Sequence, residues 1–245
     1  PGRLEADRQQ DNGVTAQNPF DTPPRLQSIS QDIVGIKLEP IVALNARRRV
    51  GVEVLSVLSD TEHSEDFFRH QSADASLTLL EAQLAALKNT PHGNNLFINL
   101  PITVLTAPAP FARLINMKTA PLNIEIVDLP LFLALSAAQK QSVVNNLRQL
   151  QERGHTIWLD DIDETIIQPF LFCRLPLNGI KIDKNAFWRL RATPALRKLV
   201  SLCFQLAGSV LIEGIETERD RIWALQAGAD LGQGYYWPSW TWPED

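Results

Sequence analysis

The chain alternates between short runs of β-branched and aliphatic residues and longer stretches in which apolar residues recur at helical spacing. Eight of the short runs predict strands, at residues 35–43, 50–58, 96–100, 122–127, 156–160, 179–183, 209–213 and 230–235. Helical stretches separate most of them. This alternation predicts an α/β fold, with a (β/α)₈ barrel favoured and a doubly wound open sheet as the alternative.

The last predicted helix is recognisable by its ends. Thr217 with Asp220 resembles a capping box, and Gly228 is suited to closing the helix. The spacing of Ile222 and Leu225 predicts that both side chains face inward.

The first 32 residues lack this alternation and contain scattered apolar residues among Pro, Gln, Asn and Asp. Such a composition buries too little apolar surface to offset the entropy of ordering the segment. We therefore expect a flexible linker or arm at 1–32 and a barrel domain at 33–245. Because the chain begins with Pro1, we also expect it to be a piece of a longer protein with a further domain upstream.

Composition narrows the class of function. The 245 residues carry 28 acidic and 23 basic side chains, a formal net charge of −5, which argues against general nucleic-acid binding. No apolar run approaches the length of a membrane span, and no signal segment opens the chain. Cys173 and Cys203 lie far apart and are expected to be buried thiols of a reducing compartment. These features predict a cytoplasmic protein.

Polar residues occur where buried parallel strands are normally apolar throughout. Most of the predicted strands hold one or two of them at or near the C-terminal end: Glu53, Asn99, Glu125, Asp160, Asp161, Lys181, Glu213 and Gln233. Taken singly, a Glu in a strand more often faces solvent, and an Asn or Asp at a strand end more often forms a turn or a helix cap. In a barrel, however, these strand ends converge on one rim, where this fold places its active sites.

The charge balance of this rim predicts a metal site. Five converging carboxylates repel one another, and Lys181 alone cannot balance them. Carboxylate and amide oxygens without Cys or His are the ligands of hard cations. The rim therefore indicates one or two Mg²⁺ or Mn²⁺ ions, with Asp160 and Asp161 suited to holding two of them close together.

Short motifs along the chain resemble one known family. Glu39-Pro40-Ile41-Val42 and Glu53-Val54-Leu55 are followed in order by INLP, IEIVD, LDD, KID, EGIE and QGY, each containing one or more of the polar rim residues. Over about residues 33–240 the chain is similar to the EAL domains, cyclic-di-GMP-specific phosphodiesterases built on a modified TIM barrel.

The resemblance implies a role for each matching position. It implies metal ligands at Glu53, Asn99, Glu125, Asp160 and Asp161, catalytic groups at Lys181, Glu213 and Gln233, and substrate-binding groups at Glu39, Leu55, Asp183 and Tyr235. The implied reaction is attack of a metal-activated water on one phosphodiester of cyclic di-GMP, giving linear pGpG. The resemblance also implies a homodimer.

The chain departs from the family pattern outside the rim residues. Val57 stands where active members usually have an arginine that contacts substrate phosphate, Glu39 stands in place of a glutamine, and 162–165 lacks the glycines of the family's loop. Asp128 also replaces a longer glutamate. These changes leave open a degenerate EAL domain that acts as a cyclic-di-GMP receptor or protein-binding module without turnover. Glu39 alone leaves open a different nucleotide substrate.

The tryptophans near the C-terminus have two interpretations. Trp237, Trp240 and Trp242 could form a platform on which a base stacks, because aromatic faces stack on guanine. The favoured interpretation is that they close the end of the barrel or cover a subunit interface.

Overall fold

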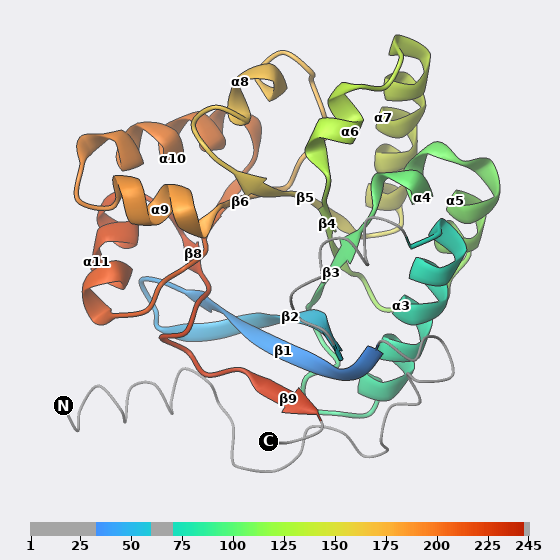
Figure 1. The fold of residues 1–245 in the computed structure, drawn as a ribbon, viewed down its shortest axis with the longest axis horizontal. Helices are drawn as coiled ribbons and strands as arrows, with labels where there is room; N and C mark the ends of the chain where they lie inside the picture. Colours follow the sequence, from blue (N-terminus) through green and yellow to red (C-terminus); the bar gives the residue numbers. More distant parts are fainter. Residues whose placement is uncertain (1–32, 60–70, 243–245) are drawn as a thin grey trace.

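The computed structural model describes residues 33–59 and 71–242. Eight strands close into a barrel in the order β2-β3-β4-β5-β6-β7-β8-β1, with β1 pairing back onto β2 (Figure 1). The strands are β1 Ile33–Ala43, β2 Arg48–Leu58, β3 Leu96–Leu100, β4 Asn123–Ile126, β5 Thr156–Ile162, β6 Gly179–Ile182, β7 Ser209–Ile212 and β8 Leu231–Gly232. The predicted barrel is confirmed, and the open-sheet alternative is wrong. The predicted linker, 1–32, lies outside the described residues.

One strand of the barrel is inverted. β1 runs antiparallel to both of its barrel neighbours, β2 and β8, whereas β2 to β8 are parallel to one another. A four-residue turn joins β1 to β2, and Arg47 in this turn takes a left-handed conformation with φ 51°. The start of β1 therefore lies at the same rim as the C-terminal ends of the other seven strands.

The helices lie on the outside of the barrel (Figure 1). They are α3 Ala73–Leu87, α4 Ile102–Thr106, α5 Pro108–Ile115, α6 Leu129–Leu133, α7 Ala137–Glu152, α8 Ile167–Phe170, α9 Lys184–Leu190, α10 Pro194–Leu206 and α11 Glu218–Gln226. Among the described residues, no helix is long and apolar enough to cross a membrane.

The inward face of α11 differs from the prediction. Thr217 caps the helix by accepting a hydrogen bond from the Asp220 amide, but Ile222 is 39% exposed, so its predicted inward orientation is wrong. Arg221 is buried instead, because its guanidinium donates to the carbonyl oxygen of Leu44 in the β1–β2 turn. Leu225 packs against the core as predicted, so the polar contact of Arg221 takes the place of Ile222 alone.

Of the three tryptophans near the C-terminus, Trp237 packs into the core, and Trp240 and Trp242 belong to an additional strand. β9 Trp240–Trp242, which the sequence did not predict, pairs antiparallel with β1 on the outside of the barrel. Trp237 is only 1% exposed and belongs to the core, so it cannot stack on a nucleotide. Trp240 stacks on His92 with 4.6 Å between the ring centroids. The packing interpretation is confirmed for Trp237.

Side chains fill the barrel interior in layers of four drawn from alternate strands, as expected for this architecture. The lower apolar layer comes from the odd-numbered strands and contains Ile41, Phe97, Trp158 and Leu211. Gly179 leaves room for the Trp158 ring, since a Cβ on this glycine would lie 2.3 Å from it.

Two polar layers lie above the apolar one. The strand register and the alternation of side chains place the residues of the even-numbered strands next and those of the odd-numbered strands above them. The even layer contains Glu53, Glu125, Lys181 and Gln233, and the odd layer contains Glu39, Asn99, Asp160 and Glu213. The barrel interior therefore changes from apolar to charged within one step along the strands.

Candidate metal centre and active site

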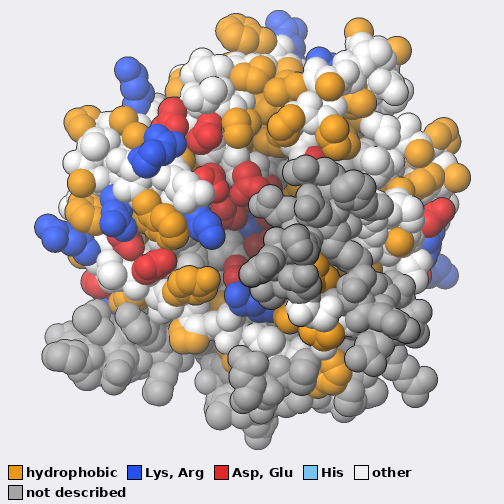
Figure 2. Space-filling model, in the orientation of Figure 1, with side chains coloured by type: hydrophobic (Ala, Val, Ile, Leu, Met, Phe, Trp, Pro, Cys, Tyr) orange, Lys and Arg blue, Asp and Glu red, His pale blue; other side chains and the backbone are white. Residues whose placement is uncertain are grey.

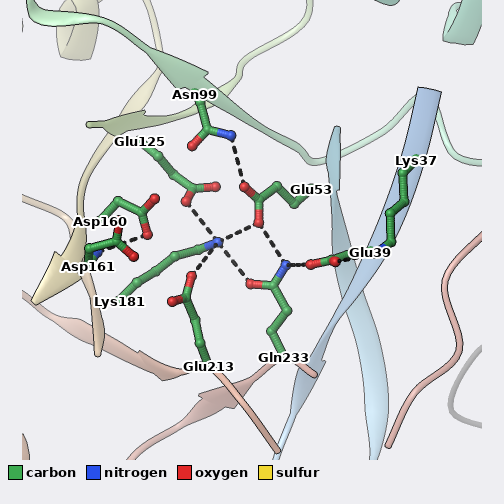
Figure 3. A network of polar contacts seen from close by, with 10 residues as sticks. All are labelled: Lys37, Glu39, Glu53, Asn99, Glu125, Asp160, Asp161, Lys181, Glu213 and Gln233. Carbon is green, nitrogen blue, oxygen red and sulfur yellow. Dashed lines mark hydrogen bonds and ion pairs between the residues drawn. The ribbon is translucent and has the colours of Figure 1, made fainter. Parts of the chain in front are cut away.

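Lys181 on β6 lies at the centre of the polar layers (Figure 3). Its side chain is fully buried, and its Nζ lies 2.9 Å from Glu53 Oε1 and 2.8 Å from Glu125 Oε1. Nζ also donates to Gln233 Oε1 at 2.9 Å and lies 3.8 Å from Glu213 Oε1. One ammonium group thus holds side chains from four strands or strand ends together.

The network continues toward β1. Gln233 Nε2 donates to Glu53 Oε1 at 2.7 Å and to Glu39 Oε2 at 2.9 Å. The other oxygen of Glu39 pairs with Lys37 Nζ at 3.1 Å. On the opposite side, Asn99 Nδ2 donates to Glu53 Oε2 at 2.9 Å. Glu53 therefore accepts hydrogen bonds at both of its oxygens.

A β-bulge brings two consecutive aspartates to one side of β5. Adjacent residues of a regular strand point to opposite faces, but the register of β5 shifts between Leu159 and Ile162, and Asp161 takes φ 52°. Oxygens of Asp160, Asp161 and Glu213 consequently lie within 4.8 Å of one another. Bulges commonly re-aim side chains next to active sites, and this one creates an acidic cluster.

The carboxyl groups differ strongly in proton affinity. Burial, and then the nearby charge of Glu53, raise the pKa of Glu125 well above its usual value. Burial and Asp160 do the same for the pKa of Glu213. Although part of the Asp161 side chain reaches solvent, enclosure in the site and the charge of Asp160 raise its pKa to about 7. The cluster therefore has more negative charge than the protein alone stabilises.

Glu53 and Lys181 are the charged pair of the network. Burial opposes ionisation of Glu53, but the charge of Lys181 and the hydrogen bonds from Gln233, Lys181 and Asn99 hold its pKa below the usual value. Burial also opposes the charge of Lys181, and Glu125 and Glu53 outweigh it, so the pKa of Lys181 lies well above its usual value. These carboxylates therefore favour the protonated form of Lys181.

The donor set fits a divalent cation. Asn99 Oδ1 and both oxygens of Glu125 are buried and accept no hydrogen bond from the residues that the structure describes, although Oε1 of Glu125 forms an ion pair with Lys181. Buried acceptors without partners are costly unless another group satisfies them. Oxygen atoms from amide and carboxylate groups are the ligands that Mg²⁺ and Mn²⁺ accept. The described residues thus offer an oxygen-lined site beside the cluster of Asp160, Asp161 and Glu213.

A cavity opens directly beside these oxygens. Its volume is about 410 Å³, and Glu53, Asn99, Asp160 and Asp161 line one side of it. Gln83 and other residues of α3 line the other side together with Leu55 and Ser56 of β2. Figure 2 shows acidic side chains in a hollow near the centre of the view and basic side chains to their left and below them. Four residues of the candidate metal centre thus form part of the wall of this cavity.

The comparison with family models decides the assignment. The model of the EAL domain matches residues 25–239. The chain belongs to the EAL domain family. The present chain is 26% identical over 231 residues to "Probable cyclic di-GMP phosphodiesterase PdeB" of Escherichia coli (strain K12). The match covers 86% of this chain and 43% of that protein. The chain thus spans less than half the length of the curated relatives that it matches.

Solved structures confirm the fold. An EAL domain protein from Listeria monocytogenes EGD-e superposes with a TM-score of 0.69 at 21% identity, covering 89% of this chain and 93% of that one. The calcium and cyclic-di-GMP complex of BlrP1 from Klebsiella pneumoniae gives a TM-score of 0.67 at 20% identity, covering 98% of this chain and 66% of that one. At these identities the likeness establishes the architecture of the EAL domain.

In this EAL domain, the predicted metal-ligating and catalytic residues converge, and Glu39 lies at the edge of their network (Figure 3). The other predicted substrate-binding residues lie around it. Leu55 lines the cavity, and Tyr235 is 75% exposed. Asp183 caps α9 by accepting from the amides of Asn185 and Ala186. Their roles in binding substrate stay predictions.

The sequence analysis did not predict three residues of the site, Lys37, Gln83 and Ser56. Lys37 pairs with Glu39. Gln83 donates to Ser56 Oγ at 2.9 Å, and both residues line the cavity. The signal for Lys37 was its position two residues before Glu39, which puts both side chains on one face of β1. Gln83 gave no signal, because it lies among the apolar residues of α3.

The loop after the paired aspartates is ordered without glycine. Asp163 Oδ1 accepts from the amides of Thr165 and Ile166 at 2.8 and 2.7 Å. Glu164 forms a two-fold contact with Arg189 of α9, at 2.6 and 3.3 Å. Hydrogen bonds from Asp163 and Glu164 thus stabilise the conformation of this loop, which contains no glycine.

Proposed function

We propose that this EAL domain is a metal-dependent phosphodiesterase that hydrolyses cyclic di-GMP to linear pGpG and so lowers the concentration of this messenger. The observation that carries the proposal is the pair of unpartnered buried acceptors, Asn99 Oδ1 and Glu125 Oε2, next to the acidic cluster. Support comes from two relatives, the probable cyclic di-GMP phosphodiesterase PdeB and BlrP1, whose structure is a complex with cyclic di-GMP.

The residues divide into two groups of metal ligands. Glu53, Asn99, Glu125 and Asp160 would hold a first Mg²⁺ or Mn²⁺ ion, and Asp161 with Glu213 would hold a second. Bound there, the ions supply a water of lowered pKa and stabilise charge on the phosphoryl oxygens.

The other residues position the reactants. Lys181, held between Glu53 and Glu125, orients the attacking water and offsets negative charge in the transition state. Gln233 fixes the carboxylate of Glu53 through its amide hydrogen bond. The water oxygen bonds to phosphorus as the bond from phosphorus to the sugar 3′ oxygen breaks, and that oxygen takes a proton. One water is consumed, and linear pGpG is the product.

The substrate is expected to lie across the cavity and the rim. Leu55 offers an apolar surface in the cavity. Outside the cavity wall, Glu39, Asp183 and the exposed Tyr235 would supply polar or aromatic contacts. A carboxylate at Glu39 accepts hydrogen bonds from N–H groups, which the Watson–Crick edge of guanine supplies.

A turnover assay on the purified domain tests the proposal. We expect cyclic di-GMP to be converted to linear pGpG with Mg²⁺ or Mn²⁺, and conversion to fall by at least a hundredfold in Glu53→Ala and Lys181→Ala. Glu152→Gln, an exposed change on α7, is the matched control and should turn over normally. Absence of product from the wild type, or unchanged rates in both site variants, would contradict the proposal.

A receptor or protein-binding module without turnover is the second candidate. Val57 favours it, since the position lies half-buried opposite Gly35 and brings no cation to the cavity. Calorimetry with cyclic di-GMP in calcium separates the two ligand-dependent cases from a protein adaptor. Heat of binding without turnover in Mg²⁺ or Mn²⁺ would identify a receptor, and no heat would leave the adaptor.

We also propose a homodimer that depends little on the loop after Asp161. Glu164 in this loop is engaged by Arg189 of its own chain. A Glu164→Ala variant should therefore elute with the wild type on size exclusion. A shift of the variant alone to monomer would contradict this.

A further inference from the structure

We infer that Lys37 binds the phosphate of the substrate diester at the rim of the barrel. The inference rests on the proposed function and adds to it a specific binding residue. Lys37 is absent from the motifs that define the family resemblance, and it enters the site only because β1 is inverted.

The strand register places Lys37 at the mouth of the site. On β1, Lys37 lies opposite Leu55, and Glu39 lies opposite Glu53. Because alternate residues share a face, Lys37 points to the same side as Glu39, one step closer to the rim. Its partner Leu55 lines the cavity that leads to the acidic cluster. Lys37 is not itself a lining residue, so it would contact a substrate phosphate at the rim, next to the cavity wall formed by Leu55.

The two cations of the network differ in availability (Figure 3). Lys181 is fully buried and surrounded by carboxylates and an amide oxygen. The Lys37 side chain is 30% exposed and has an ion pair with Glu39 alone among the ion pairs of the described residues. Partly exposed ion pairs contribute little to stability, so a phosphate can draw the ammonium group away at low cost.

Glu39 does not depend on Lys37 for a partner. Its Oε2 accepts from Gln233 Nε2 at 2.9 Å, while Lys37 contacts Oε1. The network below therefore stays intact when Lys37 moves. Tyr235 holds the other side of the ammonium group, since its ring centroid lies 5.9 Å from Lys37 Nζ. The Lys37 ammonium group thus lies between the Glu39 carboxylate and the Tyr235 ring, and its side chain is partly exposed to solvent.

Lys37 compensates for a cation that Val57 does not provide. Val57 lies on the same face of β2 as Leu55, one step further toward the rim, beside Gly35. Lys37 on the neighbouring strand brings a positive charge to the same part of the rim. A charge-assisted contact to phosphate changes affinity by roughly ten- to a hundredfold.

Binding and kinetics of Lys37→Ala test the inference. We expect the Kd for cyclic di-GMP in calcium, measured by calorimetry, and the KM with Mn²⁺ to rise by about 10–100-fold, with kcat changed by less than about threefold. Lys37→Arg should keep most of the affinity. Lys198→Ala, which removes an exposed lysine on α10, is the control and should leave both constants unchanged.

A double variant separates phosphate binding from simple neutralisation of Glu39. If Lys37 only balances that carboxylate, Lys37→Ala combined with Glu39→Gln recovers the affinity of Glu39→Gln alone. We expect the double variant to stay about 10–100-fold weaker than Glu39→Gln. Equal affinity would overturn the role of Lys37. A wild type that neither binds nor cleaves cyclic di-GMP overturns the proposed function and this inference together, whereas binding that is indifferent to Lys37 overturns the inference alone.

Discussion

The lower layer of the barrel interior is filled by apolar side chains, whereas the layers above it are filled by charged and amide side chains. Below, the rings of Phe97 and Trp158 meet edge to face, with 5.2 Å between their centroids, and close the barrel by contact. Above, side chains of similar size close it by charge, with Lys181 at the centre. The lower layer is complete in the protein alone, whereas the upper layers keep unpartnered acceptors at Asn99 and Glu125.

This difference separates stability from function. Apolar packing lowers the free energy of the folded state without a ligand. Buried carboxylates raise it unless a cation compensates them. Substitutions in the lower layer should therefore change stability equally with and without metal, and substitutions in the upper layers should change stability in a metal-dependent way.

The largest effect is expected for Lys181→Met. Removal of the ammonium group leaves Glu53 and Glu125 buried without their shared partner. We expect a loss of about 3–5 kcal/mol in the free energy of unfolding of the metal-free domain, together with loss of turnover. Urea denaturation in chelator and in excess Mg²⁺ measures it, and part of the loss should be recovered in Mg²⁺. An equal loss in both conditions would show that the two layers do not differ in this respect.

A comparable loss of stability without metal dependence is expected for Trp158→Ala. The indole is 4% exposed and fills the space above Gly179, so truncation leaves a cavity and costs about 3–5 kcal/mol. The same denaturation series checks it. A smaller loss in Mg²⁺ than in chelator would contradict the assignment of this layer to packing alone.

Gly179→Ala tests the same layer by overfilling it. The new methyl group would lie 2.3 Å from the Trp158 ring, and overpacking of this kind costs about 1–3 kcal/mol. Combining it with Trp158→Phe should recover part of the stability, because the smaller ring makes room. If the double variant loses the full sum of the single losses, the contact between the two residues is not the cause.

The weakest effect is expected from pH. The pKa of Asp161 is raised to about 7, and those of Glu125 and Glu213 are raised as well. A carboxyl group with a raised pKa in the folded state stabilises the fold below its unfolded pKa, and this contribution is lost as pH rises through the folded value. The metal-free domain should therefore lose stability between about pH 4 and pH 7 on account of Asp161.

Denaturation midpoints in chelator at pH 5 and pH 8 measure this effect. Asp161→Asn removes the titrating group and should flatten part of the decline. Saturating Mg²⁺ should flatten more of it, because the carboxylates then have a cation partner. A midpoint that rises from pH 5 to pH 8 in chelator would contradict the sign.

The sequence predicted the barrel and its polar rim because both follow local patterns. Strand periodicity located β1 to β8, and the polar residues in or just after most predicted strands identified most members of the network. What it could not predict depends on long-range contacts. The inversion of β1 makes Lys37 part of the rim, and β9 forms only by pairing with β1.

Two other features have the same origin. The bulge that turns Asp160 and Asp161 to one side depends on the register between β5 and β6. Arg221 faces inward on α11 only because the β1–β2 turn offers it the carbonyl of Leu44. The spacing of apolar residues along α11 does not reveal this hydrogen-bond partner. The spacing therefore predicted that Ile222 faces inward, whereas its side chain is exposed.

Titration of the metal-free domain with Mn²⁺ tests the central claim most directly. Calorimetry on the wild type should show saturable binding, and Glu125→Gln should bind at least 10–100-fold more weakly, since it replaces a buried carboxylate whose Oε2 accepts no hydrogen bond from the described residues. Trp158→Phe, one layer below, should bind as the wild type does. Absence of Mn²⁺ binding to the wild type, or equal affinity in Glu125→Gln, would contradict the assignment of the polar layers to a metal centre.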